Sequence, residues 1–155
     1  MRLTSADLED QLRKVRDLEG RLTFQLAVLS RALDHQGADL LRDQPINLTA
    51  YRILNIVDTW GTISISELSR TCGIDRGQIS RTADALAGQG LVRFQDDSDN
   101  RRKKLVALTD AGLAKLDEVR PRFLTRNRHL EEALGPEALG GLRLGLKRLS
   151  EVLED

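Results

Sequence analysis

Hydrophobic positions in the first third of the chain repeat at helical spacing. Leucine and valine recur at steps of three and four residues with one step skipped, a pattern that predicts one long amphipathic helix. Ser5 or Thr4 is placed to cap its start. The stripe consists of Leu8, Leu12, Val15, Leu22, Leu26, Leu29 and Leu33.

The last twenty residues repeat this spacing. Pro136 follows Gly135 and fits the first position of a second leucine-striped helix. Gly140, Gly141 and Gly145 each weaken this helix by about 1 kcal/mol relative to alanine, so we expect it to depend on a packing partner. Its stripe consists of Leu139, Leu142, Leu146, Leu149 and Leu153.

Shorter elements occupy the middle of the chain. The pattern predicts a helix over about 49–59, with Thr49 as its N-cap and Gly61 as its stop. The next residues are ISISELSRTCG, which alternate briefly and then form a short helix capped by Ser64 or Ser66.

A further helix begins at Asp75 as N-cap and reaches about Gly88. A β-hairpin is then predicted from LVRFQ and KKLVAL, joined by the polar segment DDSDNRR. Thr109 and Asp110 open another helix, which Pro121 should end or kink. This order of elements predicts a mainly α fold with a small β-hairpin.

The helix that begins after Asp75 has an unusually polar start. On a wheel of about 100° per residue, Ala83 and Leu86 lie within about 40° of Ile79 and form a narrow apolar stripe. Arginine and glutamine can make bidentate contacts with guanine and adenine in the major groove, and the first-turn N–H groups favour a phosphate. A solvated surface face is the alternative interpretation of this helix alone. The polar positions are Arg76, Gly77, Gln78, Ser80, Arg81 and Asp84.

The surroundings of this helix favour nucleic acid. A short helix, a glycine-containing turn and a second helix make a helix-turn-helix, and the hairpin carries RRKK beside its tip. Such a loop can follow a phosphate backbone or enter a minor groove. The net charge of the whole chain is zero, but residues 76–104 hold seven cations against four anions. This basic patch predicts double-stranded DNA as the partner.

Residues 63–112 resemble the MarR-type winged helix-turn-helix transcription regulators. The matching pieces are ELS, D-R-x-x-I-S-R, L-x-x-x-GLV, and the wing sequence NRR followed by LT-x-x-G. They span about a third of the chain, and the flanking helices agree with that family in type and position. The fold class implied is a winged helix-turn-helix with N- and C-terminal dimerisation helices.

The resemblance implies a homodimer in which the first and last helices intertwine and each recognition helix enters the major groove. It further implies a ligand-responsive repressor of a pseudo-palindromic operator, with an effector of unknown identity. The DNA-binding residues would be Arg76, Gln78, Ser80 and Arg81 in the recognition helix and Arg101 and Arg102 in the wing.

The wing departs from the family at one position. The family usually has aspartate, which helps to hold the wing arginine, where this chain has Asn100. Either the adjacent Asp99 takes that part, or the wing is held more loosely.

We expect one intertwined domain with three parts. Residues 1–45 are the N-terminal dimerisation helix and linker, 46–110 the winged helix-turn-helix, and 111–155 the C-terminal dimerisation helices. Intramolecular core is the alternative interpretation of both leucine stripes.

Composition and residue spacing indicate the cellular location, the absence of a metal site and the role of the single cysteine. The chain has no run of about 18 apolar residues and its start lacks the apolar core of a signal peptide, so we expect a cytoplasmic protein with no membrane partner. His35 and His129 have no cysteine or histidine companions at metal-ligand spacing, and we predict no metal and no cofactor. The single cysteine, Cys72, is interpreted as a buried structural thiol, with a redox sensor as the alternative.

Two other functions are alternatives to DNA binding. No nucleophile with a neighbouring base, phosphate loop or paired-carboxylate motif is found, so no enzymatic activity is predicted. A winged-helix protein-interaction module would favour acidic or apolar residues at the positions of Arg81, Arg101 and Arg102. Activation in place of repression also stays open. Phe24, Tyr51 and Trp60 are assigned to core packing, with a ligand cleft as the alternative.

Overall fold

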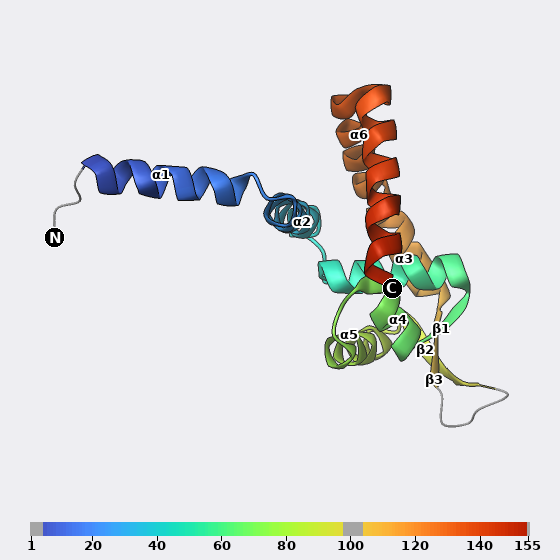
Figure 1. Ribbon diagram of the computed structural model, residues 1–155. Helices are drawn as coiled ribbons and strands as arrows, with labels where there is room; N and C mark the ends of the chain where they lie inside the picture. The colour runs from blue at the N-terminus through green and yellow to red at the C-terminus, as the bar shows by residue number, and fades with distance from the viewer. Residues whose placement is uncertain (1–4, 98–103, 155) are drawn as a thin grey trace. The chain divides into compact units, whose positions relative to one another are not determined.

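The computed structural model describes residues 5–97 and 104–154 and divides into two compact units, residues 1–48 and 49–155 (Figure 1). The elements in chain order are α1 (Ser5–Glu19), α2 (Leu22–Asp39), α3 (Leu48–Trp60), β1 (Thr62–Ser64), α4 (Ile65–Cys72), α5 (Arg76–Gly88), β2 (Val92–Asp96), β3 (Lys104–Leu108) and α6 (Asp110–Glu154).

The first unit contains two helices where the leucine spacing predicts one. Arg21 is extended, with φ −72° and ψ 127°, and separates α1 from α2. Glycine has a low helix propensity, and Gly20 lies in the gap of the apolar stripe between Val15 and Leu22. The prediction of a single helix was therefore wrong. Ser5 is already the first residue of α1, and Thr4 lies outside the described residues.

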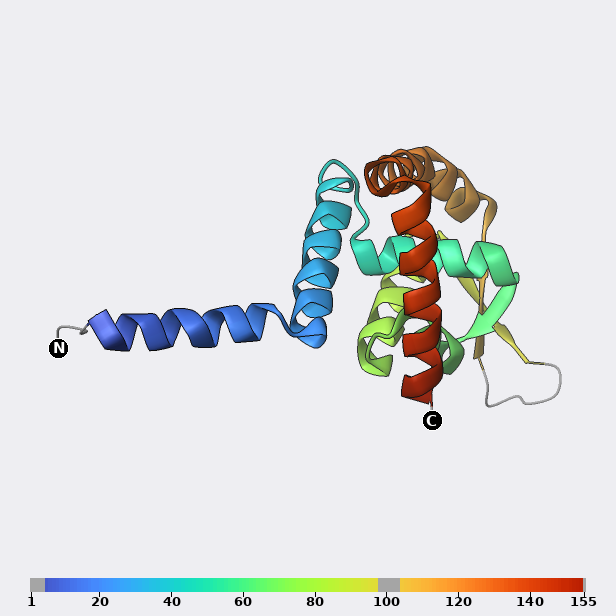
Figure 2. The same ribbon diagram turned by 45° about the horizontal axis from the view of Figure 1, so that its top comes forward.

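The second unit begins with α3, α4 and α5, which lie together beside the strands (Figure 2). Thr49 is the second residue of α3, so its assignment as N-cap was wrong. Gly61, with φ 79°, ends α3 as predicted. Ser64 caps α4 through a capping box, in which its hydroxyl accepts from the Glu67 amide and the Glu67 carboxylate accepts from the Ser64 amide.

The strands form a three-stranded antiparallel sheet in the order β1-β3-β2. Val106 pairs with Ile63 on one side and with Phe94 on the other. The predicted hairpin of β2 and β3 is confirmed. The brief alternation before α4 forms the short third strand, β1.

The core of the second unit joins all of its helices to the sheet. The predicted stripe of Ile79, Ala83 and Leu86 is buried, with 0–1% of each residue exposed. The mainly α fold with a small hairpin is thereby confirmed. The largest fully buried side chains are those of Ile53, Leu54, Val57, Leu68, Ile79, Leu86, Val106, Leu116 and Val119.

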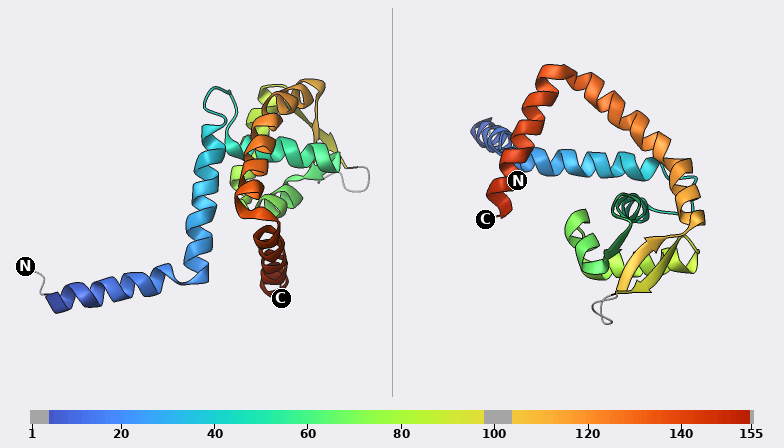
Figure 3. Two further views of the ribbon diagram at one scale, coloured as in Figure 1. Left: turned by 90° about the horizontal axis from the view of Figure 1, so that it is seen from above. Right: turned by 90° about the vertical axis from the view of Figure 1, so that its right-hand side faces the viewer.

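Helix α6 continues through Pro121, so of the two predicted outcomes, an end or a kink, the structure excludes the end. Proline removes one backbone hydrogen bond, but Val119 and Phe123 are buried on either side of it and hold the segment in place. The real break lies at Gly135, where φ 69° and ψ 167° are values that essentially only glycine adopts. Figure 3 shows α6 turning sharply in this region. Pro136 then starts the second segment, as predicted.

A candidate nucleic-acid interface

The start of α5 is fixed by its cap. The Asp75 carboxylate oxygen Oδ1 accepts hydrogen bonds from the amides of Gly77 at 2.9 Å and Gln78 at 3.1 Å. Before it, Gly73 adopts φ 63°, and the Ser69 hydroxyl donates to the Ile74 carbonyl at 2.7 Å. The turn of the helix-turn-helix therefore holds the first turn of α5 in a defined position.

The α5 residues predicted to bind DNA differ in their exposure to solvent. Arg76, Gln78 and Arg81 are exposed, whereas Ser80 is half-buried beside the buried stripe. The structure thus brings three long hydrogen-bonding side chains to the exposed surface of one capped helix.

Two of these side chains have specific neighbours. A Cβ atom added to Gly77 would lie 3.4 Å from Nη1 of Arg81, so the Arg81 guanidinium lies beside the first turn of α5. This follows from the tilt of helical side chains toward the N-terminus. Gln78 donates from Nε2 to the Thr49 hydroxyl on α3 at 3.4 Å. Sequence reasoning missed Thr49 because its partner lies 29 positions away.

The described part of the wing is held at its base. Arg93 donates from Nη1 to the Leu108 carbonyl at 2.6 Å, so this arginine connects β2 to the end of β3. Lys104 is exposed, with its Nζ 6.0 Å from the centre of the Phe94 ring. The wing residues Asp99, Asn100, Arg101 and Arg102 lie outside the described residues.

The LT-x-x-G piece joins the wing to α6. The Thr109 hydroxyl donates to the Gly90 carbonyl at 2.6 Å and accepts from the Gly112 amide at 3.0 Å. A Cβ atom on Gly112 would lie only 1.9 Å from the Leu91 carbonyl oxygen, so α6 approaches the backbone just before β2 more closely than any other residue type would allow. This motif is structural.

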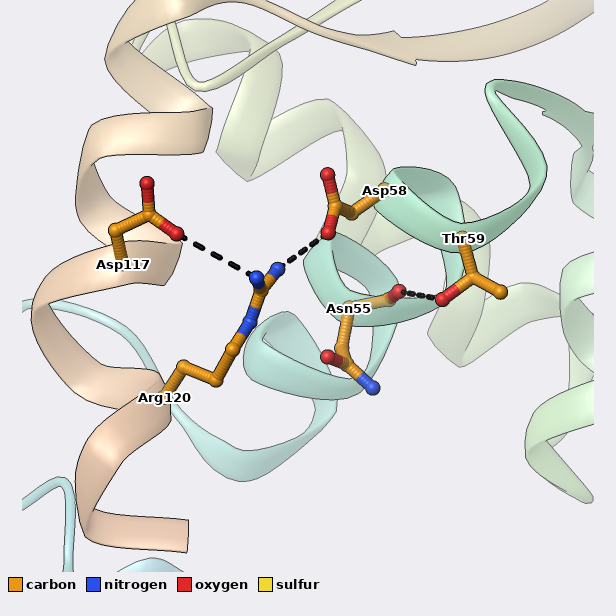
Figure 4. A network of polar contacts seen from close by, with 5 residues as sticks. All are labelled: Asn55, Asp58, Thr59, Asp117 and Arg120. Carbon is orange, nitrogen blue, oxygen red and sulfur yellow. Dashed lines mark hydrogen bonds and ion pairs between the residues drawn. The ribbon is translucent and has the colours of Figure 1, made fainter. Parts of the chain in front are cut away.

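Helices α3 and α6 are connected by polar and aromatic contacts. Figure 4 shows the Arg120 guanidinium between the carboxylates of Asp58 and Asp117, with Asp58 on α3. Tyr51 of α3 stacks on Phe123 of α6, with ring centres 3.7 Å apart and planes 8° apart. Burial raises the pKa of the Tyr51 hydroxyl, an effect that the positive charges of Arg120 and Arg126 oppose.

Two single residues differ from their predicted environments. Trp60 is 65% exposed, so its assignment to the core was wrong. Cys72 is half-buried rather than buried, and this burial raises the pKa of its thiol despite the opposing charge of Arg52. A raised thiol pKa leaves less thiolate at neutral pH, which is unfavourable for an oxidant sensor.

Comparison with known proteins decides the class. The model of the MarR family matches residues 46–104, which include α3, the helix-turn-helix and both wing strands. Residues 46–104 are thus a MarR-type winged helix-turn-helix, the DNA-binding domain of a transcription regulator.

Similarity to known proteins extends beyond the matched segment, and the solved structures among them share the fold. The uncharacterised protein Rv2011c of Mycobacterium tuberculosis is 25% identical over 134 residues, which cover 86% of this chain and 93% of that protein. BpsR of Bordetella bronchiseptica, whose DNA binding is regulated by 6-hydroxynicotinic acid, is 19% identical with a TM-score of 0.76, covering 85% of this chain and 94% of BpsR. A mutant of E. coli MarR in complex with operator DNA is 21% identical with a TM-score of 0.74, covering 83% and 92%.

Other kinds of site find no support within the described segments. In residues 5–97 and 104–154, no group of three or more histidine, cysteine, aspartate or glutamate side chains could hold a metal ion. No helix in the same ranges is long and apolar enough to cross a membrane.

Proposed function

We propose that this protein is a MarR-family regulator that binds a pseudo-palindromic operator as a homodimer and represses transcription by covering it. The observation that carries this proposal is the exposure of Arg76, Gln78 and Arg81 in the first two turns of a helix whose start is capped and whose apolar stripe is buried. Such a helix can enter a major groove without unfolding any part of its lobe. Ser80, being half-buried, suits a phosphate contact near the edge of the groove.

The dimer part of the proposal rests on the leucine stripe of α6. Leu142, Leu146 and Leu153 are 40%, 48% and 83% exposed in the single chain. Exposed leucines at heptad-like spacing are costly in water and are buried when a second copy packs on them. A twofold dimer would place two recognition helices about 10 base pairs apart, which matches the inverted half-sites of an operator. In this proposal residues 1–45 and 111–155 serve dimerisation and 46–110 binds DNA.

Ligand response forms a separate part of the proposal. The support is the fold shared with BpsR, whose DNA binding is regulated by 6-hydroxynicotinic acid. We propose that a small molecule changes the spacing of the two recognition helices and so lowers operator affinity. A panel of small aromatic acids, added at fixed salt to the operator complex, tests this. Unchanged affinity and unchanged dimer shape across the panel would leave the regulator without ligand control.

Selection of bound sequences from random duplex DNA tests the main proposal. Purified protein is incubated with the duplex pool at low and moderate salt, and light scattering gives the stoichiometry of the selected complex. We expect an enriched inverted repeat bound by one dimer. Failure to enrich any sequence at either salt concentration would contradict the proposal and favour a protein-interaction module.

A further inference from the structure

We propose that Thr49 is a positioning residue for base recognition, although it lies outside the recognition helix. The inference rests on the proposed function, since it assumes that Gln78 contacts a base. It begins from the hydrogen bond in which Gln78 Nε2 donates to the Thr49 hydroxyl at 3.4 Å. This contact connects the first turn of α3 with the first turn of α5.

The backbone of both partners is already fixed. The Gln78 amide is held by the Asp75 cap at 3.1 Å, and Ile79, the next residue, is fully buried. Thr49 precedes Ala50, which is 4% exposed, on a helix whose Ile53 and Leu54 are fully buried. The exposed side chain of Gln78 is therefore the mobile part of this contact. A long side chain loses conformational entropy when a base immobilises it, and a bond already present reduces that loss.

The Thr49 bond leaves Gln78 able to recognise a base edge. The side-chain amide has two N–H groups and one carbonyl oxygen. One N–H donates to Thr49, while the second N–H and the carbonyl oxygen can pair with N7 and the N6 amino group of adenine. Guanine has two acceptors, N7 and O6, at the same place. An amide held in this orientation would therefore bring the Gln78 carbonyl oxygen against O6 of guanine. Thr49 would therefore increase the preference for adenine over guanine.

The test compares variants on the operator obtained by selection. The position read by Gln78 is first located as the one where Gln78→Ala relaxes base preference. Thr49→Val removes the hydroxyl while keeping the shape, and we expect it to lower the adenine preference at that position by about 2- to 10-fold, the ratio that corresponds to one hydrogen bond. Thr49→Ser should retain the preference. In a Gln78→Ala background, Thr49→Val should have no further effect.

Thr59 supplies a matched control on the same helix. Its hydroxyl donates to the Asn55 carbonyl at 2.9 Å and is exposed on α3, so Thr59→Val makes the same chemical change away from α5. We expect Thr59→Val to leave base preference unchanged, and thermal unfolding of both variants checks that each is folded. An equal loss of affinity for every sequence in Thr49→Val would overturn the inference, because it would make Thr49 a phosphate contact.

The outcomes separate this inference from the proposed function. If the unmodified protein selects no sequence, the proposed function fails. If it selects an operator and Gln78→Ala relaxes one position, but Thr49→Val matches the unmodified protein there, only the role of Thr49 is overturned. If Gln78→Ala leaves every position unchanged, Gln78 reads no base and the inference is likewise overturned.

Discussion

Single residues at the start of α5 divide into those that build the helix and those that extend from it. Asp75 satisfies two backbone amides, and Ile79 fills the core. Arg76 and Arg81 do neither, since the side chains of both are exposed. This division supports a binding role for the arginines, because exposed side chains can change partners at little cost to the fold.

Replacing Arg81 with alanine should weaken operator binding. If its guanidinium contacts a base, the change should cost about 1–3 kcal/mol of binding free energy and relax specificity at one position. Titration of the selected operator by fluorescence anisotropy at matched salt measures this. Arg128→Ala, an equivalent change at an exposed position on α6, is the control and should bind normally. Equal affinities for the two variants would remove Arg81 from the interface.

Among the elements, the junction of the wing with α6 is the most tightly constrained. Thr109 connects the loop after α5, through Gly90, with the first turn of α6, through Gly112. The pair Arg120–Asp58 and the stack of Tyr51 on Phe123 then hold α6 against α3. These contacts allow a displacement of α6 to be transmitted to the DNA-binding lobe, which any effector of the proposed kind would require.

Replacing Gly112 with alanine should destabilise this junction. The new methyl group would lie 1.9 Å from the Leu91 carbonyl oxygen, so the backbone must shift. We expect a loss of about 1–3 kcal/mol in the free energy of unfolding, the usual cost of overpacking. Urea unfolding followed by circular dichroism measures it. Gly88→Ala is the control because its added methyl meets no atom within 4 Å, and a stability of Gly112→Ala equal to that control would contradict the close approach.

At the scale of the whole molecule, the single chain leaves apolar surface uncovered. The exposed leucines of α6 after Gly135 are not among the buried core residues. The lobe around α3, α4 and α5, by contrast, has its own buried core. The second segment would therefore bury apolar surface on packing against a second copy. The proposed dimer and the proposed operator symmetry depend on this segment.

Replacing Leu146 with lysine should dissociate the proposed dimer. Leu146 belongs to the apolar stripe, and a charge buried in a dimer interface is strongly unfavourable. We expect a monomer by light scattering and a loss of affinity for the inverted repeat, while binding to a single half-site persists weakly. Leu144→Lys is the matched control, since Leu144 is 50% exposed against 48% for Leu146 but lies off the stripe. A dimer that survives in Leu146→Lys would place the interface elsewhere.

Local signals were sufficient for much of this protein. Asp75 and Ser64 cap helices because a side-chain oxygen two or three residues from an orphan amide can bond it regardless of the rest of the fold. The stripe of Ile79, Ala83 and Leu86 is buried because helical periodicity alone places these residues on one face. The MarR-type pieces also determined the class, since their order encodes helix, turn, helix and wing.

Tertiary structure decided the remaining features, because the residues that determine them lie far apart along the chain. Pro121 stays within α6 because buried side chains on both sides outweigh one lost hydrogen bond, and Trp60 is exposed because no neighbouring element covers it within the described chain. Thr49 contacts Gln78 across 29 positions, which no local pattern can indicate. The sequence by itself determined which helix presents its polar face, whereas packing determined which residues hold that face in place.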